Sequence, residues 1–587
     1  STRKESSAAS DVYKRQQLSA IGAYTYTNGE ERTYRSTMKL SGDRVLGPSE
    51  LKHKMGKTIY KTFQATAEYN KTIGGHTFGI LAGYSWEQED YRYVQGSRDK
   101  FPGNDLPYLN AGSPDNQKSE GTGNAWAIQS GFGRLRYNFN ERYLFESTVR
   151  YDGSSRFPQS KKFGFFPSVA AGWRLSEENF FKENESLGFI SNLKLKVSWG
   201  RLGNQNIGNY PYQSVYELGQ NYPFGDTYTQ GAAVTTAVDP TIKWEETETI
   251  DGGLEAVFWN GLLSVNASYF NRRTYDILYK PSGSVSTILG QKISEMNTGE
   301  LKNFGWEFEV GHRNKIGDVS YNVNANLSII KNKLTTLGVG NVEQLNGMVG
   351  NGSDLFIGYP IQMYYGYVSD GVFLDENDIK SWYDQSKVTP NPQPGDIRYK
   401  DISGPDGVPD GKIDPNYDRV YLGSRIPKFT FGLNLGVEYK GLDLSVLLQG
   451  VAGVTGMLDG FAGWAFRGDG NIQKWQAEGR FDPANPTRYP AYPRLEDLSN
   501  STTPNIVTSD FWTQDASYIR LKNIQLGYTF PKKMLQAAKI SNLRVYVQAE
   551  NPLCWNKYKP GWDPEINTSG NYYPILATYT FGVNFKF

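Results

Sequence analysis

The sequence predicts an all-β protein that folds as an antiparallel transmembrane β-barrel. Three features of its 587 residues predict this fold: apolar and polar residues alternate in many segments, many of these segments are about ten residues long, and their connections alternate between tight turns and very long loops. A tilted strand of about ten residues crosses a bilayer, whereas strands in globular proteins usually have about five or six. A closed barrel also leaves no unpaired backbone groups in lipid.

The alternation is clearest in three segments, 143–151, 319–329 and 577–587. In 319–329, apolar residues from Val319 to Ile329 take every second position, and Ser and Asn residues lie between them. Because successive side chains of a strand point to opposite faces, this pattern predicts strands with one apolar and one polar face. We predict roughly sixteen strands in all. Similar runs occur near 63–69, 78–86, 132–139, 193–199, 263–269, 306–310, 429–439, 442–448 and 543–549.

The connections fall into two classes, as expected of a barrel with short turns on one side of the membrane and long loops on the other. The tight turns are Asn140-Glu141, Asn260-Gly261, Ile316-Gly317-Asp318 and Lys440-Gly441. We predict long extracellular loops near 88–126, 202–248, 331–427 and 452–514, with short helices near 376–386, 470–478 and 532–538. Aromatic residues gather at strand ends, where an interfacial girdle requires them: Tyr84, Trp86, Trp199, Phe258, Trp259 and Phe530.

The composition excludes several classes of function. The 62 Lys and Arg residues nearly balance the 61 Asp and Glu residues, so no basic field is available to bind nucleic acid. A single cysteine excludes an intrachain disulfide framework and a four-cysteine metal site, and three histidines leave little material for a zinc enzyme. The sequence contains no GxSxG, HExxH or GxGxxG motif and marks out no pair of catalytic carboxylates. We therefore predict that the protein is not an enzyme and has no catalytic residues.

The first sixteen residues differ from the rest. Residues 1–16 are polar and contain no apolar stretch, so we interpret them as a non-native or disordered tail. The barrel is predicted to occupy residues 17–587.

One loop has the composition of a metal site. Asp401, Asp406, Asp410 and Asp414 lie close together with several glycines, and such carboxylates suit a hard cation such as Ca²⁺. The spacing departs from a calcium loop of the EF-hand type because Val408 and Pro409 interrupt it. Two interpretations remain open, a metal-free structured turn and a calcium site, and no other cofactor is predicted.

The long loops carry aromatic residues that are candidates for ligand binding. Aromatic rings stack on the apolar faces of sugars, while amides and carboxylates bind the hydroxyl groups. The alternative is that these rings pack one loop against another. The candidates are Tyr212, Phe224, Trp464 and Phe466.

Several motifs, taken in order, resemble those of the SusC/RagA-like family of TonB-linked outer-membrane transporters of Bacteroidetes. The resemblance runs from about residue 57 to Phe587. It rests on the segments 150–157 (RYDGSSRF), 163–169 (GFFPSV after Phe163), 172–177 (GWRLSE), 197–210 (VSWGRLGNQNIGNY), 243–247 (KWEET), 272–278, 297–308, 395–401, 427–429 and 561–565 (GWDPE). The alternating strand that ends in Phe587 also resembles the signal recognised by outer-membrane assembly machinery.

The resemblance implies a fold and a set of partners. Family members have a TonB box and a plug domain before a barrel of about twenty-two strands. Since this chain supplies about sixteen strands, the resemblance implies a carboxy-terminal barrel fragment without the plug. It also implies a location in the outer membrane, contact with outer-membrane lipid, a SusD-like surface lipoprotein as partner, and energy from the TonB–ExbB–ExbD complex acting through the amino-terminal region. The family's calcium-like loop reads DxNGDGxID, and residues 401–414 depart from it.

The expected function is TonB-dependent active import of oligosaccharides. The alternatives are import of peptides or another nutrient by the same mechanism, and a passive porin or adhesin built on the same barrel. A surface glycan hydrolase would require two carboxylates about 5–10 Å apart in a cleft, and the sequence marks out no such pair.

Overall fold

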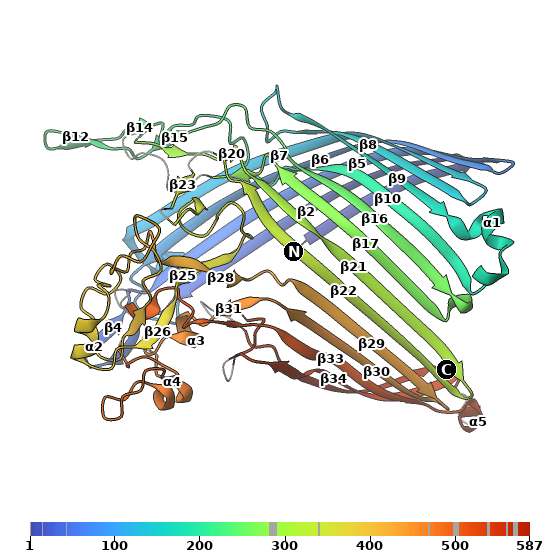
Figure 1. The fold of residues 1–587 in the computed structure, drawn as a ribbon. Coiled ribbons are helices and arrows are strands. Elements are labelled where there is room, and N and C mark those ends of the chain that lie inside the picture. Colours follow the sequence, from blue (N-terminus) through green and yellow to red (C-terminus); the bar gives the residue numbers. More distant parts are fainter. Residues whose placement is uncertain are drawn as a thin grey trace.

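One antiparallel sheet makes up most of the chain in the computed structural model (Figure 1). The structure describes residues 2–13, 16–42, 44–280, 290–338, 341–344, 346–467, 470–496, 504–536, 540–558, 562–566 and 573–586. Across the sheet the strands are β1 (Thr2–Tyr13), β2 (Gln16–Arg35), β5 (Glu50–Ile73), β6 (His76–Asp99), β7 (Ser113–Phe139), β8 (Tyr143–Ser154), β9 (Phe163–Arg174), β10 (Ile190–Asn204), β16 (Glu245–Phe258), β17 (Leu263–Tyr275), β21 (Glu300–Ile316), β22 (Val319–Thr336), β29 (Phe429–Tyr439), β30 (Leu442–Ala452), β33 (Tyr518–Thr529), β34 (Asn542–Asn556) and β35 (Thr578–Lys586). Phe587 and Gly561, which belong to segments quoted above, lie outside the described residues.

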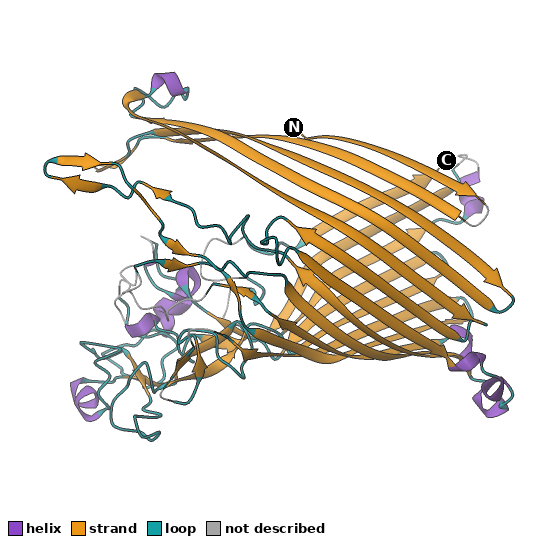
Figure 2. Ribbon diagram, turned by 90° about the horizontal axis from the view of Figure 1, so that it is seen from above, coloured by secondary structure: helices purple, strands orange, loops and turns teal. Residues whose placement is uncertain are grey.

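Each strand of this sheet pairs with its neighbours along the chain, and the sheet curls into an incomplete barrel (Figures 1 and 2). It has seventeen strands in the described part of the chain, against the sixteen or so predicted. Among the described residues, the edge strands β1 and β35 do not pair with each other, and no plug domain is present. The predicted all-β, partial barrel is therefore confirmed.

The two ends of the barrel differ in their connections. Tight turns at Asn140-Glu141, Asn260-Gly261, Gly317 and Lys440-Gly441 place residues at positive φ between 48° and 93°. Helices α1 (Asn179–Lys182) and α5 (Lys532–Leu535) lie at this turn end, and α2 (Glu376–Ser381), α3 (Gly460–Gly463) and α4 (Lys474–Gly479) lie at the opposite, loop end (Figure 1). None of the helices in the described part of the chain is long and apolar enough to cross a membrane.

The loop end carries many short elements. The short strands are β3 (Met38–Ser41), β4 (Arg44–Leu46), β11 (Glu217–Leu218), β12 (Tyr222–Phe224), β13 (Thr227–Thr229), β14 (Ala232–Ala233), β15 (Thr236–Ala237), β18 (Leu278–Tyr279), β19 (Lys292–Ile293), β20 (Met296–Asn297), β23 (Val342–Glu343), β24 (Val349–Gly350), β25 (Met363–Tyr367), β26 (Ser369–Val372), β27 (Ile397–Tyr399), β28 (Arg419–Ser424), β31 (Thr455–Met457) and β32 (Thr513–Asp515). Single 3₁₀ turns occur at Leu109–Ala111, Leu175–Glu177, Glu185–Leu187, Trp259–Gly261 and Pro504–Ile506. Those at Leu175–Glu177, Glu185–Leu187 and Trp259–Gly261 belong to connections at the turn end.

The structure differs from the loop predicted over 88–126. Strand β6 continues to Asp99 and β7 begins at Ser113, so the connection covers only 100–112. Strands β5 and β6 have 24 residues each and β7 has 27, more than twice the length needed to cross a bilayer. A bilayer needs only about ten residues of each strand, so we expect the distal halves to lie outside the lipid, where no uniformly apolar face is required. The other long connections run over 205–244, 276–299, 337–428 and 453–517.

The structure also differs from the tail predicted over 1–16. Residues Thr2–Tyr13 form β1, which pairs with β2 from Thr2–Thr27 to Tyr13–Gln16. Backbone groups along the edge of β2 accept such a partner whatever its side chains, so a polar segment can extend the sheet without an apolar face. Residues 1, 14 and 15 lie outside the described residues.

Alternate side chains divide every long strand into an outward and an inward face. On β22 the row from Val319 to Ile329 is apolar, and the Ser and Asn residues between them lie on the other face, as predicted. Residues opposite each other on neighbouring strands are both apolar or both polar: Phe63 lies opposite Trp86, and Arg136 lies opposite Glu146. The apolar face meets lipid and the polar face lines the lumen.

The main apolar core lies in the loops at the loop end. Connections 337–428 and 453–517, together with Tyr558 after β34, pack around buried aromatic and aliphatic side chains, which we call the loop core. Its buried members are Tyr367, Val372, Ile397, Tyr399, Ile413, Leu458, Ala462, Ala465, Phe481, Tyr492, Trp512, Ala516 and Tyr558. These long loops therefore fold into an ordered structure over the barrel mouth.

Candidate functional site

Four of the motifs that are far apart in the sequence meet where β8, β9, β10 and β16 reach the loop end. They bury one cluster, Phe157, Phe166, Ile207, Ile242 and Trp244, which we call the rim cluster. The Trp244 ring lies 5.2 Å from Phe157 and 5.3 Å from Phe166, measured between centroids. Its Nε1 donates a hydrogen bond of 2.9 Å to the carbonyl of Lys162. The rim cluster therefore fixes the connections 155–162 and 205–244 on the barrel mouth.

Arg156, in the RYDGSSRF motif, joins these two connections directly. Its Nη1 donates hydrogen bonds to the carbonyls of Gln205, at 3.2 Å, and Ile207, at 2.8 Å. Its guanidinium carbon lies 5.4 Å from the centroid of the Trp126 ring. Ser155 accepts a 2.9 Å bond from the backbone of Ala127, which ties the same connection to β7. The motif thus positions a cation beside an aromatic ring on the inward face.

The extended halves of β5, β6 and β7 present an aromatic surface to the lumen, which we call the aromatic wall: Tyr60, Tyr91, Tyr93 and Trp126. The Tyr60 hydroxyl donates a 2.6 Å bond to Glu87. Trp126 Nε1 donates a 3.2 Å bond to Glu89. Each of these two rings is therefore held beside a carboxylate, an arrangement suited to ligands that offer both apolar faces and hydroxyl groups.

Sequence reasoning missed the aromatic wall because Tyr91, Tyr93 and Trp126 fall in the predicted loop 88–126, and Tyr60 precedes the alternating run near 63–69. A signal was present in the sequence: Glu87, Glu89, Tyr91 and Tyr93 repeat at every second position. That period of two indicates a strand even where neither face is uniformly apolar.

A cavity of about 810 Å³ lies beside the aromatic wall, and we call it the rim pocket. This volume falls in the range of roughly 300–1,000 Å³ that small-molecule sites occupy. Its walls come from strands β6 and β7 and from three connections at the loop end. They are Glu89, Asn124, Trp126, Arg156, Asn206, Ile207, Gly208, Asn209, Leu278, Tyr279, Lys280 and Glu295.

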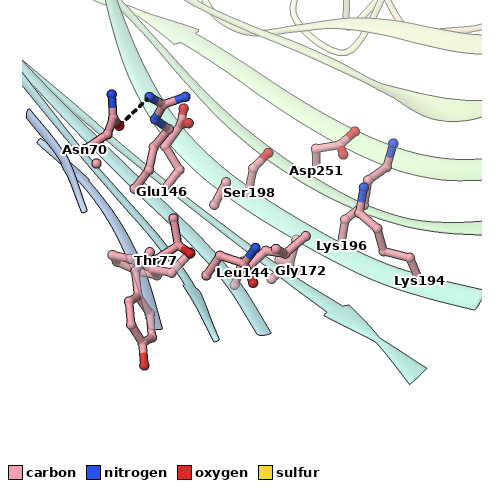
Figure 3. Close-up of a pocket in the computed structure, with 17 residues that line it drawn as sticks. Asn70, Thr77, Leu144, Glu146, Gly172, Lys194, Lys196, Ser198 and Asp251 are labelled. Atoms are coloured by element: carbon pink, nitrogen blue, oxygen red, sulfur yellow. Dashed lines mark hydrogen bonds between the residues drawn. The ribbon is translucent and has the colours of Figure 1, made fainter. Parts of the chain in front are cut away.

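Towards the turn end the lumen is lined by paired charges. Figure 3 shows Lys194, Lys196, Ser198 and Asp251 along one side of a second cavity, of about 530 Å³. Glu255 accepts from Lys194 at 2.9 Å and from Lys196 at 3.0 Å. Across the same cavity, Arg136 and Glu68 form an ion pair of 2.6 Å. This part of the lumen therefore offers polar contacts and carries charges of both signs.

The four predicted aromatic candidates lie in two connections, Tyr212 and Phe224 in 205–244 and Trp464 and Phe466 in 453–517. Tyr212 packs against the rim cluster, and Phe224 is 68% exposed on the β12–β13 hairpin, where its ring contacts Tyr222. Trp464 packs against the loop core with the Arg467 guanidinium 5.1 Å from its ring, and Phe466 is 36% exposed. The structure therefore assigns packing roles to Tyr212 and Trp464, and their binding roles stay a prediction.

The four aspartates of the predicted calcium loop mostly bind backbone groups and a lysine. Asp401 accepts from the Gly411 amide at 2.6 Å, Asp410 from the Lys412 amide at 3.0 Å, and Asp414 from the Asn416 amide at 2.8 Å. Asp414 also pairs with Lys387, and Asp406 is exposed. In the part of the chain that the structure describes, no group of three or more His, Cys, Asp or Glu side chains could hold a metal ion. The calcium site stays a prediction.

Asp418, which the sequence did not single out, organises this loop. Its fully buried carboxylate accepts from the amides of Ile402 at 2.7 Å, Ser403 at 3.2 Å and Asp414 at 2.6 Å. Burial raises the pKa of Asp418 although these hydrogen bonds oppose the shift. Sequence spacing contains no signal for this role, since only the folded loop brings the three amides to one carboxylate.

The fold and the site together define the class of protein. The outward apolar face, the polar lumen, and the short turns at one end with long ordered loops at the other are those of an outer-membrane barrel. The chain belongs to the family described as TonB dependent receptor-like, beta-barrel, whose profile matches residues 5–551. The resemblance inferred from the motifs is confirmed, the barrel is an outer-membrane protein, and the family is one of transport receptors rather than enzymes.

Named relatives refine this assignment. TonB-dependent receptor SusC of Bacteroides thetaiotaomicron is 28% identical over 92% of this chain and 50% of its own length. TonB-dependent receptor P3 of Formosa agariphila is 27% identical over 96% of this chain and 56% of its own length. The structure of the RagAB peptide importer in its open-open state covers all of this chain and 62% of that chain, with a TM-score of 0.79 and 25% identity. The chain spans about half the length of the curated relatives it matches.

Proposed function

We propose that this chain forms the barrel of a TonB-dependent active importer of oligosaccharides. A SusD-like surface lipoprotein captures the glycan over the long loops, and the TonB–ExbB–ExbD complex supplies the energy through the amino-terminal region that the resemblance implies. No covalent step is involved. The observation that carries the proposal is the aromatic wall, whose rings stand beside carboxylates at the entrance to a polar lumen.

The chemistry of the wall favours a glycan. The half-buried rings of Tyr60 and Trp126 suit the apolar faces of sugar rings, and Glu87 and Glu89 are acceptors for hydroxyl groups. Towards the turn end, Lys194, Lys196 and Glu255 offer polar contacts to a ligand that passes through the lumen. The similarity to TonB-dependent receptor SusC supports the dependence on TonB.

Import of peptides is the second candidate. The observation that favours it is the likeness to the RagAB peptide importer, at a TM-score of 0.79. A peptide would use the same aromatic faces, and its backbone would pair with the same carboxylates and amides.

Uptake by whole cells tests the proposal. Cells carrying the full-length gene and its neighbouring lipoprotein gene are offered a panel of neutral oligosaccharides and peptides, with and without TonB. We expect depletion of oligosaccharide that requires TonB. TonB-dependent depletion of peptides alone would replace the glycan by the second candidate, and uptake that is indifferent to TonB would indicate a passive porin.

A further inference from the structure

The outward face of three neighbouring strands, β17, β21 and β22, carries a group of cations just past the lipid-facing segment (Figure 1). On β22 the apolar row ends at Ile329, and Lys331 and Lys333 are the next two residues on the same face. Lys302 of β21 lies directly opposite Lys333, and Arg273 of β17 lies directly opposite Lys302. We call Lys302, Lys331 and Lys333 the lysine cluster.

The lysine cluster lies at the level of the lipid headgroups. A tilted strand crosses the hydrocarbon in about 9–11 residues, and the apolar row 319–329 has that length. Trp306, which is 48% exposed, lies opposite Ile329 and has its ring 5.1 Å from that of Tyr269, as in the aromatic belt that marks a membrane interface. The lysines follow this belt towards the loop end, so they face the outer leaflet.

The cations on the strands beside the cluster are paired with carboxylates. Arg201 Nη1 lies 3.4 Å from the carboxylate of Glu246, and Arg273 Nη2 lies 2.5 Å from that of Glu300. Glu300 also accepts a 3.0 Å hydrogen bond from the hydroxyl of Thr335. These positions therefore carry little free charge.

The lysine cluster differs from these neighbours because its charge is left over. In the part of the chain that the structure describes, the exposed side chains of Lys331 and Lys333 form no ion pair or hydrogen bond. Lys302 Nζ approaches Glu300 only to 3.8 Å. Like charges directly opposite each other on neighbouring strands are destabilising, so an anion bound between Lys302 and Lys333 would offset their repulsion.

The position of the cluster identifies the anion as a phosphate on a lipid. Each lysine ammonium group has three donors for phosphate oxygens, and lysines beside a membrane surface attract anionic lipids. The outer leaflet of an outer membrane contains glycolipid whose sugar headgroup carries phosphates. Asn271 lies in the same register row as Lys331 and is exposed, so its amide offers a donor and an acceptor to sugar hydroxyl groups.

We propose that the lysine cluster binds a phosphate group of an outer-leaflet glycolipid of the lipid A type, with Lys302, Lys331 and Lys333 on the phosphate oxygens and Trp306 beside the acyl chains. The inference goes beyond the proposed import function and does not depend on the cargo, because the site lies on the outward face of the barrel. It assigns one specific lipid contact to a surface that otherwise meets lipid only through apolar side chains.

Native mass spectrometry of the purified full-length protein in detergent tests the site. The probes are diphosphoryl lipid A, the same lipid after removal of its phosphates, and phosphatidylglycerol. The variants are the double substitution Lys302→Gln/Lys333→Gln, which removes two charges, and Lys302→Arg/Lys333→Arg, which keeps them. The matched control is Lys380→Gln/Lys412→Gln, which removes two charges from exposed positions in connection 337–428.

We expect lipid A to bind the glutamine variant about 25-fold more weakly than the wild type, since each lysine beside a membrane surface contributes roughly a fivefold factor. The arginine variant and the control should bind like the wild type. Equal binding by the wild type and the glutamine variant would overturn the site. Equal binding of lipid A with and without its phosphates would overturn recognition of phosphate. Phosphatidylglycerol bound as tightly as lipid A, with the same loss in the glutamine variant, would overturn the assignment to a glycolipid.

Discussion

At the scale of single residues, a few buried side chains order loops that would otherwise be long and open. Trp244 is only 4% exposed, contacts two aromatic rings and donates to a carbonyl of another connection. Asp396 is fully buried and accepts from the Asn505 side chain and the Gln393 amide, each at 2.8 Å. Each residue joins segments distant in sequence, so its loss affects more than one loop.

Replacing Trp244 tests the rim cluster. Trp244→Ala removes a large buried ring and is expected to cost about 3–5 kcal/mol locally, whereas Trp244→Phe loses mainly the N–H bond, at about 1 kcal/mol. Limited trypsin digestion reports the result, because Lys161 and Lys162 lie in the connection that Trp244 holds. Cleavage there should be much faster in the alanine variant and unchanged in Trp259→Ala at the turn end. Unchanged cleavage in Trp244→Ala would contradict the role of the rim cluster.

The Lys387–Asp414 pair predicts a pH dependence. Burial alone raises the pKa of Asp414, but the Lys387 ammonium and the amide and side chain of Asn416 hold it below its ordinary value of 3.8. A lowered folded pKa contributes stability above the unfolded pKa and loses it as the pH falls through the folded value. Wild type should therefore unfold at a higher temperature than Lys387→Met at pH 7, and the difference should shrink below pH 3.8. Lys380→Met is the control, and a difference independent of pH would contradict the pairing.

At the scale of elements, the tight turns determine where the strands end. Gly317 and Gly441 both occupy positive φ in tight turns, at 59° and 90°. A Cβ at Gly441 would lie 2.5 Å from the carbonyl oxygen of Thr529 on a neighbouring strand, whereas a Cβ at Gly317 would meet nothing within 4 Å. The two turns therefore differ in how tightly the adjacent strands enclose them.

A pair of alanine substitutions separates these two effects. Gly317→Ala should cost about 1 kcal/mol, the price of positive φ alone. Gly441→Ala should cost clearly more, because the backbone of β33 must also move. The measurement is the urea concentration at which the folded barrel mobility is lost in unheated SDS gels. Equal loss in both variants would contradict the close contact at Thr529.

At the scale of the whole molecule, successive side chains of a strand face the lipid and the lumen in turn. On β10, Lys194, Lys196 and Ser198 line the turn-end cavity, while Leu195 faces outward with 41% of its surface exposed. Two lysines therefore flank a leucine in the sequence without either charge reaching lipid.

An arginine scan across this boundary tests the sidedness. Leu195→Arg places a charge on the lipid face and should cost about 2–4 kcal/mol near the bilayer centre. Ser198→Arg, on the lumen face three positions away, should be tolerated. Equilibrium unfolding in lipid vesicles measures both variants. Equal destabilisation would contradict the assignment of the two faces.

Sequence periodicity predicted the parts of the fold where lipid imposes a pattern. The row from Val319 to Ile329 and the tight turns were recognisable because one face must be apolar and the turns need positive φ. The aromatic wall was not recognised, since Tyr91, Tyr93 and Trp126 lie in the parts of β6 and β7 beyond the length that crosses a bilayer, where no apolar face is required. Asp418 and the rim pocket depend on contacts between distant loops, for which a single sequence carries no local signal.

The pairing of each strand only with its neighbours along the chain has an evolutionary consequence. A connection at the loop end can lengthen, shorten or be replaced without shifting the register of any strand. The connections 337–428 and 453–517 share a core of their own, so they can change together as one inherited unit. The surface at the loop end can therefore change by exchange of loops, while the membrane-facing sequence, and with it insertion into the outer membrane, stays under separate selection.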